Sequence, residues 1–105
     1  MSQFVDTKDE ILKYLQAIYP RLKSDGIEKI GLFGSFAKDS SDIFSDVDIV
    51  IRSGDKFVEN HKGVDAFLYL DKLRENLSKQ FGRRVDICDE SGLKDKTVIK
   101  EAIYV

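Results

Sequence analysis

Hydrophobic residues recur at helical spacing in the first part of the chain. The spacing predicts a helix that begins at Thr7 and ends near Gly26, and its apolar stripe is Ile11, Leu15, Ile18 and Leu22. Thr7 and Glu10 are three residues apart and form a predicted capping box at its start. Pro20 cannot donate a backbone hydrogen bond inside a helix, so we expect a kink or a break there.

A second pattern of the same kind predicts a helix that begins after Asp65, its expected N-cap, and is ended by Gly82. Its apolar stripe is Ala66, Leu70, Leu73, Leu77 and Phe81. The C-terminal residues predict one more helix at 96–102 and an edge strand at 103–105. The chain therefore contains helices at its start, in its second half and near its end.

Short apolar runs between these helices predict strands at 27–33, 46–51 and 84–88. The segment 52–63 is polar and contains glycine, so we expect a loop there, with a short strand at Phe57 and Val58. The order of strands and helices predicts an α/β fold, in which a small mixed β-sheet has helices packed mainly on one side.

Two carboxylates lie two residues apart on the second predicted strand. Because side chains alternate along a strand, Asp46 and Asp48 project from the same side, and Val47 and Ile49 project from the other. Like charges this close need a shared proton or a cation between them. Oxygen ligands favour a hard ion, and Mg²⁺ takes one or two protein carboxylates and leaves its other positions to water and phosphates. The pair therefore indicates a phosphate-handling metal site.

Gly34 and Ser35 follow the first predicted strand. Glycine lets the backbone turn tightly and approach a ligand, and Ser35 is the expected cap of a short helix that begins at Phe36. Unpaired amides at the start of a helix, with a hydroxyl beside them, bind anionic phosphate. We therefore predict a phosphate-binding turn next to the carboxylates.

These motifs also have simpler interpretations. An Asp-x-Asp pair alone is more often the solvent-facing side of a half-buried strand. A calcium loop would require Asp or Asn at Val50 and glycine at Ile51, and no Gly-Lys-Ser/Thr follows a glycine loop. The segment 31–34 imitates the GxxG loop of an RNA-binding KH module, but its central Leu32 and Phe33 belong in a core.

Gly-Ser, ten intervening residues and Asp-x-Asp together form the signature of the polymerase-β-like nucleotidyltransferases. The chain resembles their smallest branch, the minimal nucleotidyltransferase (MNT) proteins, over nearly its whole length. The resemblance implies a single MNT domain over 1–105 with the polymerase-β-like fold. In that family a later strand supplies a third carboxylate, and Asp86 stands in the matching place. Many members carry arginine where this chain has Lys38, and lysine binds phosphate as a point charge without the arginine fork.

The resemblance also implies roles for these residues in nucleotidyl transfer from ATP. Asp46, Asp48 and Asp86 would hold one Mg²⁺ ion next to the acceptor hydroxyl. Asp46 and Asp48 would also hold a second Mg²⁺ ion, which accompanies the triphosphate. Asp86 would lie nearest the acceptor and help to remove its proton. The implied metal ligands are Asp46, Asp48 and Asp86, and the implied nucleotide ligands are Gly34, Ser35 and Lys38.

The acceptor is implied by the resemblance alone. MNT proteins are commonly encoded beside a helical HEPN protein, often an RNA-cleaving toxin, and members of the family attach AMP to a tyrosine of it. A chain of 105 residues has no room for a separate substrate-binding domain, so a type VII-like antitoxin and protein adenylyltransferase is our leading hypothesis. Two alternatives stay open: an antitoxin that acts by binding the HEPN protein without catalysis, and a homodimeric enzyme that modifies a small-molecule hydroxyl.

Charge and composition limit the remaining classes of ligand and cellular location. A net charge of -2 gives no broad cationic surface, which disfavours long nucleic acid as the main ligand. Cys88 is the only cysteine, the first residues lack the apolar stretch of a signal peptide, and no stretch is long enough to span a membrane. We therefore expect a cytoplasmic protein. We expect Cys88 to be a small buried side chain and His61 to lie at the surface.

Overall fold

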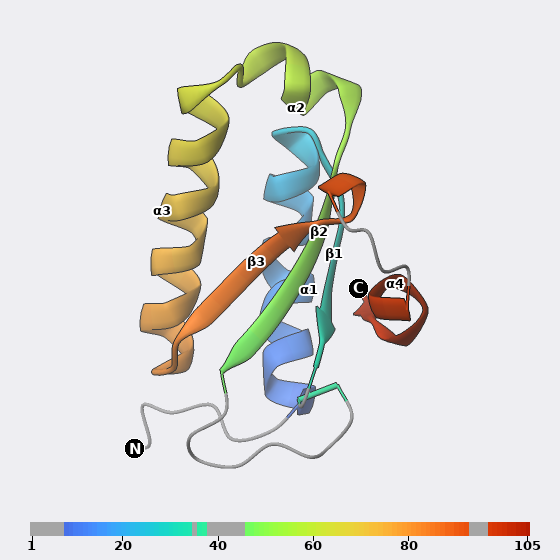
Figure 1. Ribbon diagram of the computed structural model, residues 1–105. Coiled ribbons are helices and arrows are strands. Elements are labelled where there is room, and N and C mark those ends of the chain that lie inside the picture. Colours follow the sequence, from blue (N-terminus) through green and yellow to red (C-terminus); the bar gives the residue numbers. More distant parts are fainter. Residues whose placement is uncertain (1–7, 35, 38–45, 93–96) are drawn as a thin grey trace.

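The computed structural model describes residues 8–34, 36–37, 46–92 and 97–105 (Figure 1). The elements follow one another as α1 (Lys8–Ser24), β1 (Ile27–Phe33), β2 (Val47–Ser53), α2 (Asp55–Asn60), α3 (Val64–Phe81), β3 (Val85–Asp89), the 3₁₀ turn η1 (Glu90–Gly92), α4 (Thr97–Glu101) and β4 (Ile103–Tyr104). Within these residues, no helix is both long enough and apolar enough to cross a lipid bilayer.

The four strands form one mixed sheet in the order β3-β2-β1-β4. Strand β1 is antiparallel to both of its neighbours, whereas β2 and β3 run parallel. Figure 1 shows α1 and α3 side by side behind the sheet, so the opposite side of the sheet, which we call the open face, is turned toward the viewer. The predicted α/β fold, with helices mainly on one side, is confirmed.

The hydrophobic core lies between the sheet and the two long helices. Alternate residues of the strands point toward the helices, and the predicted helical stripes meet them there. The buried core residues on the strands include Ile30, Leu32, Val47, Ile49, Ile51 and Val85, and those on the helices include Ile11, Leu15, Leu22, Leu77 and Phe81. The expected edge strand at the C-terminus is present as β4, which pairs with β1.

Helix α1 continues through Pro20 to Ser24, so of the predicted kink or break, the break does not occur. Leu15 and Leu22 are buried on either side of the exposed proline. Burying a leucine contributes about 1.5–3 kcal/mol, so two of them offset the roughly 3 kcal/mol that proline costs inside a helix. The predicted capping residue Thr7 lies outside the described residues.

The short strand predicted around Phe57 is wrong, because the segment forms helix α2. Phe57 is the buried residue of this helix, and helical spacing places His61 one turn later on the same side. Their rings stack with centroids 4.5 Å apart, and the Phe57 ring meets Tyr69 edge-on at 5.2 Å. His61 is therefore half-buried rather than at the surface.

Helix α3 begins at Val64, and its N-cap is Gly63 rather than the predicted Asp65. Asp65 lies in the first turn of the helix, where a negative charge is favoured by the free amide groups. No side chain caps this end. The predicted end of the helix is confirmed, because Gly82 is the left-handed C-cap and its amide donates to the Ser78 carbonyl at 2.9 Å.

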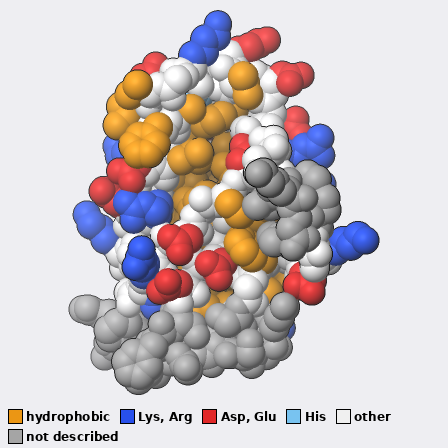
Figure 2. Space-filling view, in the orientation of Figure 1, with side chains coloured by type: hydrophobic (Ala, Val, Ile, Leu, Met, Phe, Trp, Pro, Cys, Tyr) orange, Lys and Arg blue, Asp and Glu red, His pale blue; other side chains and the backbone are white. Residues whose placement is uncertain are grey.

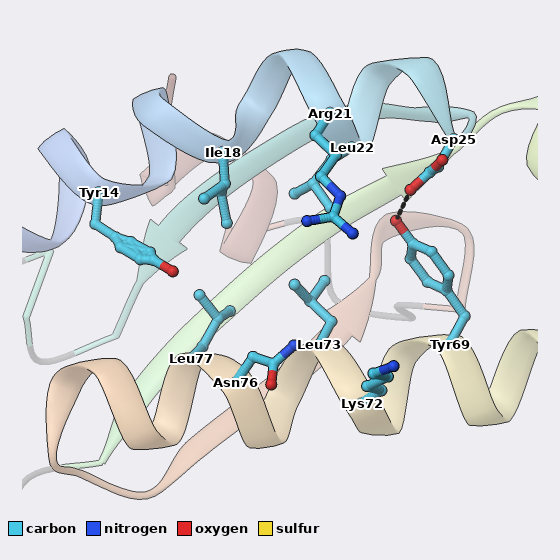
Figure 3. Close-up of a pocket in the computed structure, with 10 residues that line it drawn as sticks. All are labelled: Tyr14, Ile18, Arg21, Leu22, Asp25, Tyr69, Lys72, Leu73, Asn76 and Leu77. Carbon is cyan, nitrogen blue, oxygen red and sulfur yellow. Dashed lines mark hydrogen bonds between the residues drawn. The ribbon is translucent and has the colours of Figure 1, made fainter.

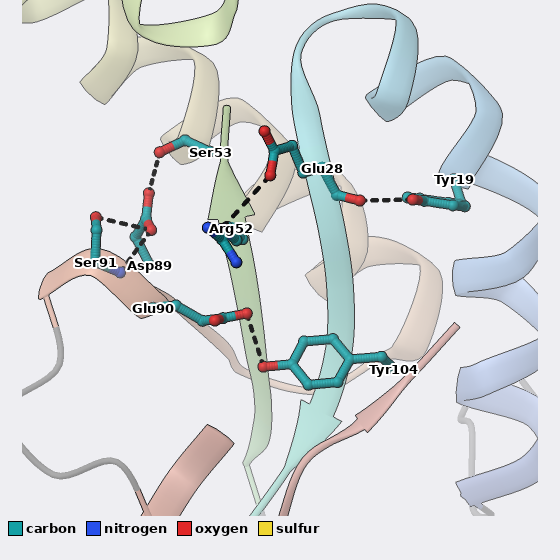
Figure 4. Close-up of polar contacts among 8 residues, drawn as sticks. All are labelled: Tyr19, Glu28, Arg52, Ser53, Asp89, Glu90, Ser91 and Tyr104. Atoms are coloured by element: carbon teal, nitrogen blue, oxygen red, sulfur yellow. Dashed lines mark hydrogen bonds and ion pairs between the residues drawn. The ribbon is translucent and has the colours of Figure 1, made fainter. Parts of the chain in front are cut away.

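Polar contacts connect the strands at the end where β2 and β3 finish (Figure 4). The Ser53 hydroxyl of β2 donates to Asp89 of β3 at 2.5 Å, and the amide and hydroxyl of Ser91 donate to the same carboxylate at 3.0 Å. The Tyr104 hydroxyl of β4 donates to the buried carboxylate of Glu90 at 2.9 Å. The Ser53–Asp89 bond joins β2 to β3 at this end, and the parallel register of the two strands determines which residues lie side by side at the opposite end.

Candidate active site

The predicted metal ligands lie together where β2 and β3 begin. Because the two strands are parallel, their first residues share one edge of the sheet, and Asp48 pairs in register with Asp86. Asp46 directly precedes β2 and is exposed, Asp48 is half-buried and Asp86 is exposed. Neighbouring strands are about 4.8 Å apart, so the sequence-distant Asp86 is brought beside Asp48 by the fold.

Asp48 faces away from the core, because its neighbours Val47 and Ile49 are fully buried on the helix side. Burial raises the pKa of the Asp48 carboxyl, and the charges of Asp86 and Asp46 raise it further. Figure 2 shows a group of acidic side chains in the lower middle of the open face. The repulsion between neighbouring carboxylates that the sequence predicts is therefore present in the folded chain.

The chemistry of these donors fits a hard divalent cation, since all three are carboxylates that repel one another. Among the residues that the structure describes, no three His, Cys, Asp or Glu side chains are arranged around one point as ligands of a metal ion. Asp46, Asp48 and Asp86 thus line one end of the sheet as separate side chains. Their role as metal ligands is taken up below as a proposal.

Gly34 forms the turn that ends β1, opposite the same carboxylates. Its φ of 76° lies in the left-handed region that favours glycine. The residue before it, Phe33, pairs with Asp48, and a Cβ atom on Gly34 would overlap the Asp48 carboxylate, with Cγ only 3.2 Å away. Glycine is required here for its backbone angle and for the space that Asp48 occupies. Of the other predicted phosphate ligands, Ser35 and Lys38 lie outside the described residues.

Cations that the sequence did not single out border the acidic group. Arg74 of α3 pairs with Asp71 at 2.7 Å. The bond to Asp71 is the main cause that raises the pKa of the Arg74 guanidinium, and the charge of Asp86 adds a smaller effect. The Arg83 guanidinium lies 5.0 Å from the ring centre of the buried Phe36, which comes just after the Gly-Ser turn. Only the packing of α3 on β3 brings Arg74 here, so no sequence motif could have revealed it.

Cys88 lies two residues beyond Asp86 on β3 and is half-buried. Burial raises the pKa of its thiol, and the charges of Asp48 and Asp89 add to the effect. A protonated thiol is a poor nucleophile and a poor metal ligand. Cys88 was predicted to be a small buried side chain, and the structure shows it half-buried.

A separate cavity of about 280 Å³ lies between α1 and α3, on the helix side of the sheet (Figure 3). Leucine and isoleucine side chains of the two helices form much of its lining, and Arg21 and Lys72 come from opposite walls. The Tyr69 hydroxyl donates to Asp25 at 2.8 Å, and burial and this bond raise its pKa. Of the predicted site residues that the structure describes, none lines this cavity, so it is distinct from the carboxylate site.

The first prediction concerns the stability of the folded chain without metal. The pKa of the Asp48 carboxyl is higher in the folded chain than in the unfolded chain. The protonated carboxyl therefore stabilises the folded chain at low pH, and this stabilisation is lost as the pH rises through the folded pKa. Asp48→Asn should therefore raise the melting temperature at pH 7 in EDTA, with a smaller difference at pH 4. Thermal unfolding at both pH values measures this. The control is Asp65→Asn, which removes an exposed carboxylate from the first turn of α3, where a negative charge is favoured, so it should lower the melting temperature slightly. A melting temperature lowered by Asp48→Asn at pH 7 would contradict the proposed destabilisation by the buried Asp48 charge and its repulsion from Asp46 and Asp86.

The chain is similar over nearly its whole length to known proteins. The sequence profile of the nucleotidyltransferase domain matches residues 8–104. The chain is 33% identical over 103 residues to protein adenylyltransferase MntA of Thermococcus cleftensis, covering 94% of this chain and 96% of that protein. A solved structure described as a minimal nucleotidyltransferase superposes with a TM-score of 0.70 at 24% identity, over 93% of this chain and 95% of the other.

A second solved structure, a toxin-antitoxin with AMP-PNP, has a TM-score of 0.59 at 21% identity and covers 92% of this chain and 70% of its own. At these identities, the two structures establish the fold alone. The family profile and the MntA relative go further, because each spans nearly all of this sequence. The chain belongs to the nucleotidyltransferase domain family and is a nucleotidyltransferase.

Proposed function

We propose that this chain is an antitoxin that transfers AMP from ATP to a tyrosine of a HEPN-domain toxin in a Mg²⁺-dependent reaction. The observation that carries the proposal is the in-register pair of Asp48 and Asp86, with Asp46 and the Gly34 turn beside it. The similarity to a protein adenylyltransferase supports AMP as the transferred group. The toxin-antitoxin structure with the same fold supports a toxin as the acceptor.

The carboxylates would hold two Mg²⁺ ions, one through Asp46, Asp48 and Asp86 and the other through Asp46 and Asp48. When bound, Mg²⁺ neutralises phosphate charge and polarises the phosphorus being attacked. Burial, and then the charges of Asp86 and Asp46, raise the pKa of Asp48, and a bound cation would favour its charged form against both effects.

The residues of the chain would position the two reactants. The Gly34 turn, with Ser35 and Lys38, binds the outer phosphates and orients the α-phosphate toward the carboxylates. The oxygen of the tyrosine hydroxyl forms a bond to the α-phosphorus, the bond to the bridging oxygen breaks, and pyrophosphate leaves. Asp86, exposed at the edge of the open face, accepts the hydroxyl proton.

Incubation with ATP labelled at the α-phosphate, Mg²⁺ and the protein encoded by the adjacent reading frame tests this proposal. We expect one or more AMP units on a tyrosine of that protein, located by mass spectrometry, and loss of its RNA cleavage at substoichiometric amounts of the antitoxin. The Asp46→Asn, Asp48→Asn double variant should leave the partner unmodified and active at the same ratio.

Two outcomes would favour other functions. Full protection by the double variant, at the same low ratio and without a mass change, would indicate an antitoxin that acts by binding alone. Label transferred to a small-molecule hydroxyl and none to protein would indicate the small-molecule enzyme.

A further inference from the structure

Within the described part of the chain, the exposed large hydrophobic side chains all lie on α2 and the first turns of α3. We call them the apolar corner: Val58, Val64, Phe67 and Leu68, which are 56%, 69%, 68% and 56% exposed. They do not belong to the stripe by which α3 packs on the sheet, which is Ala66, Leu70, Leu73, Leu77 and Phe81. An exposed cluster of this kind usually marks a surface that a partner covers.

The apolar corner adjoins the open face. Figure 2 shows hydrophobic side chains over α2 and the N-terminal half of α3 on the same face as the acidic group. Phe67, Asp71 and Arg74 follow one another at four and three residues, so they lie along one side of α3. Arg74 is close enough to Asp86 to feel its charge. One side of the helix therefore leads from the apolar corner to the carboxylates.

The distance along this side limits what can dock. Seven residues of helix separate Phe67 from Arg74, which is about 10 Å at 1.5 Å per residue. An acceptor that contacts both Phe67 and Arg74 therefore extends at least about 10 Å along α3. Two turns of a partner helix span the same length. Asp71 and Arg74, whose charged atoms are 2.7 Å apart, lie on this side of α3 beyond Phe67. They offer polar contacts to both positive and negative groups of a partner.

We propose that the apolar corner is the docking surface for the protein acceptor, which packs an apolar side chain against Phe67 while its reactive tyrosine lies at the carboxylates. This inference rests on the proposed function, which requires a protein hydroxyl at Asp86. A second copy of this chain docked on the same surface would compete with the acceptor for the space in front of the carboxylates. Docking here places the acceptor at the site without a separate substrate domain.

The test replaces Phe67 with aspartate and measures binding apart from catalysis. Binding of the protein from the adjacent reading frame is followed by calorimetry, with the Asp46→Asn, Asp48→Asn background preventing turnover. Phe67→Asp should weaken binding at least tenfold, about 1.4 kcal/mol, and raise KM for the acceptor with little change in kcat. Leu68→Ser, a milder change of an exposed side chain, should have a smaller effect in the same direction. Affinity for ATP should not change.

The control is Ala17→Asp, which adds the same charge to an exposed position of α1 behind the sheet. It should leave acceptor binding and KM unchanged. Equal binding by wild type and Phe67→Asp, or a wild type that binds no such protein, would overturn the docking proposal. A sedimentation experiment in which Phe67→Asp converts a dimer of this chain to a monomer, without affecting the acceptor, would assign the apolar corner to self-association. Binding that depends on the apolar corner without any AMP transfer would instead contradict the proposed function and leave the docking surface in place.

Discussion

Asp46→Asn, Asp48→Asn and Asp86→Asn should each lower the rate of nucleotidyl transfer roughly a thousandfold, the scale on which charge stabilisation contributes to catalysis. Each amide keeps the size of the side chain and removes a negative charge that the proposed Mg²⁺ ions need. Wild-type transfer should also stop in EDTA and return when Mg²⁺ is added. Release of pyrophosphate, followed over time at saturating ATP, measures all of these rates.

Asp89→Asn is the matched control, because it removes the same charge from the same strand three residues further on. The Asp89 carboxylate accepts bonds from Ser53 and Ser91 at the opposite end of β3. It should therefore lower the free energy of unfolding and leave the transfer rate nearly unchanged. Equal loss of transfer in Asp89→Asn and Asp86→Asn would show that the charge of the strand, and not the position of Asp86, is what matters.

Much of this fold could be predicted because the relevant signals are local. The stripes of α1 and α3, the alternation on β2 and the glycine that ends α3 depend only on near neighbours in the sequence. The grouping of Asp46 with Asp48 follows from alternation in the same way. Asp86 was predicted from the family resemblance, and the parallel pairing of β2 with β3 gives the physical reason for its place.

The errors arose where tertiary packing overrides a local preference. Burial of Leu15 and Leu22 carries α1 through Pro20, and no pattern in the sequence measures that burial. Helix α2 forms around one buried ring, that of Phe57, which needs Tyr69 from a different helix to cover it. The packing of α3 on β3 likewise brings Arg74 near Asp86. Contacts between residues far apart in the sequence leave no local pattern from which they could be predicted.

Gly34 carries the second large prediction, because the structure gives it a role that the sequence did not suggest. The motif indicated a backbone that must approach phosphate. In the folded chain, a Cβ on Gly34 would also overlap the carboxylate of Asp48. Any side chain here must therefore displace either the turn or Asp48, and both belong to the proposed site.

Gly34→Ala should reduce nucleotidyl transfer a hundredfold or more, since a displacement of about 1 Å in a catalytic group has an effect of that order. Gly63→Ala is a close control for the backbone, because Gly63 also has a left-handed φ, 57°, and a Cβ there would meet nothing within 4 Å. Both variants should lose about 1–2 kcal/mol in the free energy of unfolding from the strained φ, measured by urea titration. Only Gly34→Ala should lose activity and affinity for ATP with Mg²⁺. If Gly63→Ala loses as much activity as Gly34→Ala, the effect comes from lowered stability, and the overlap with Asp48 does not control the reaction.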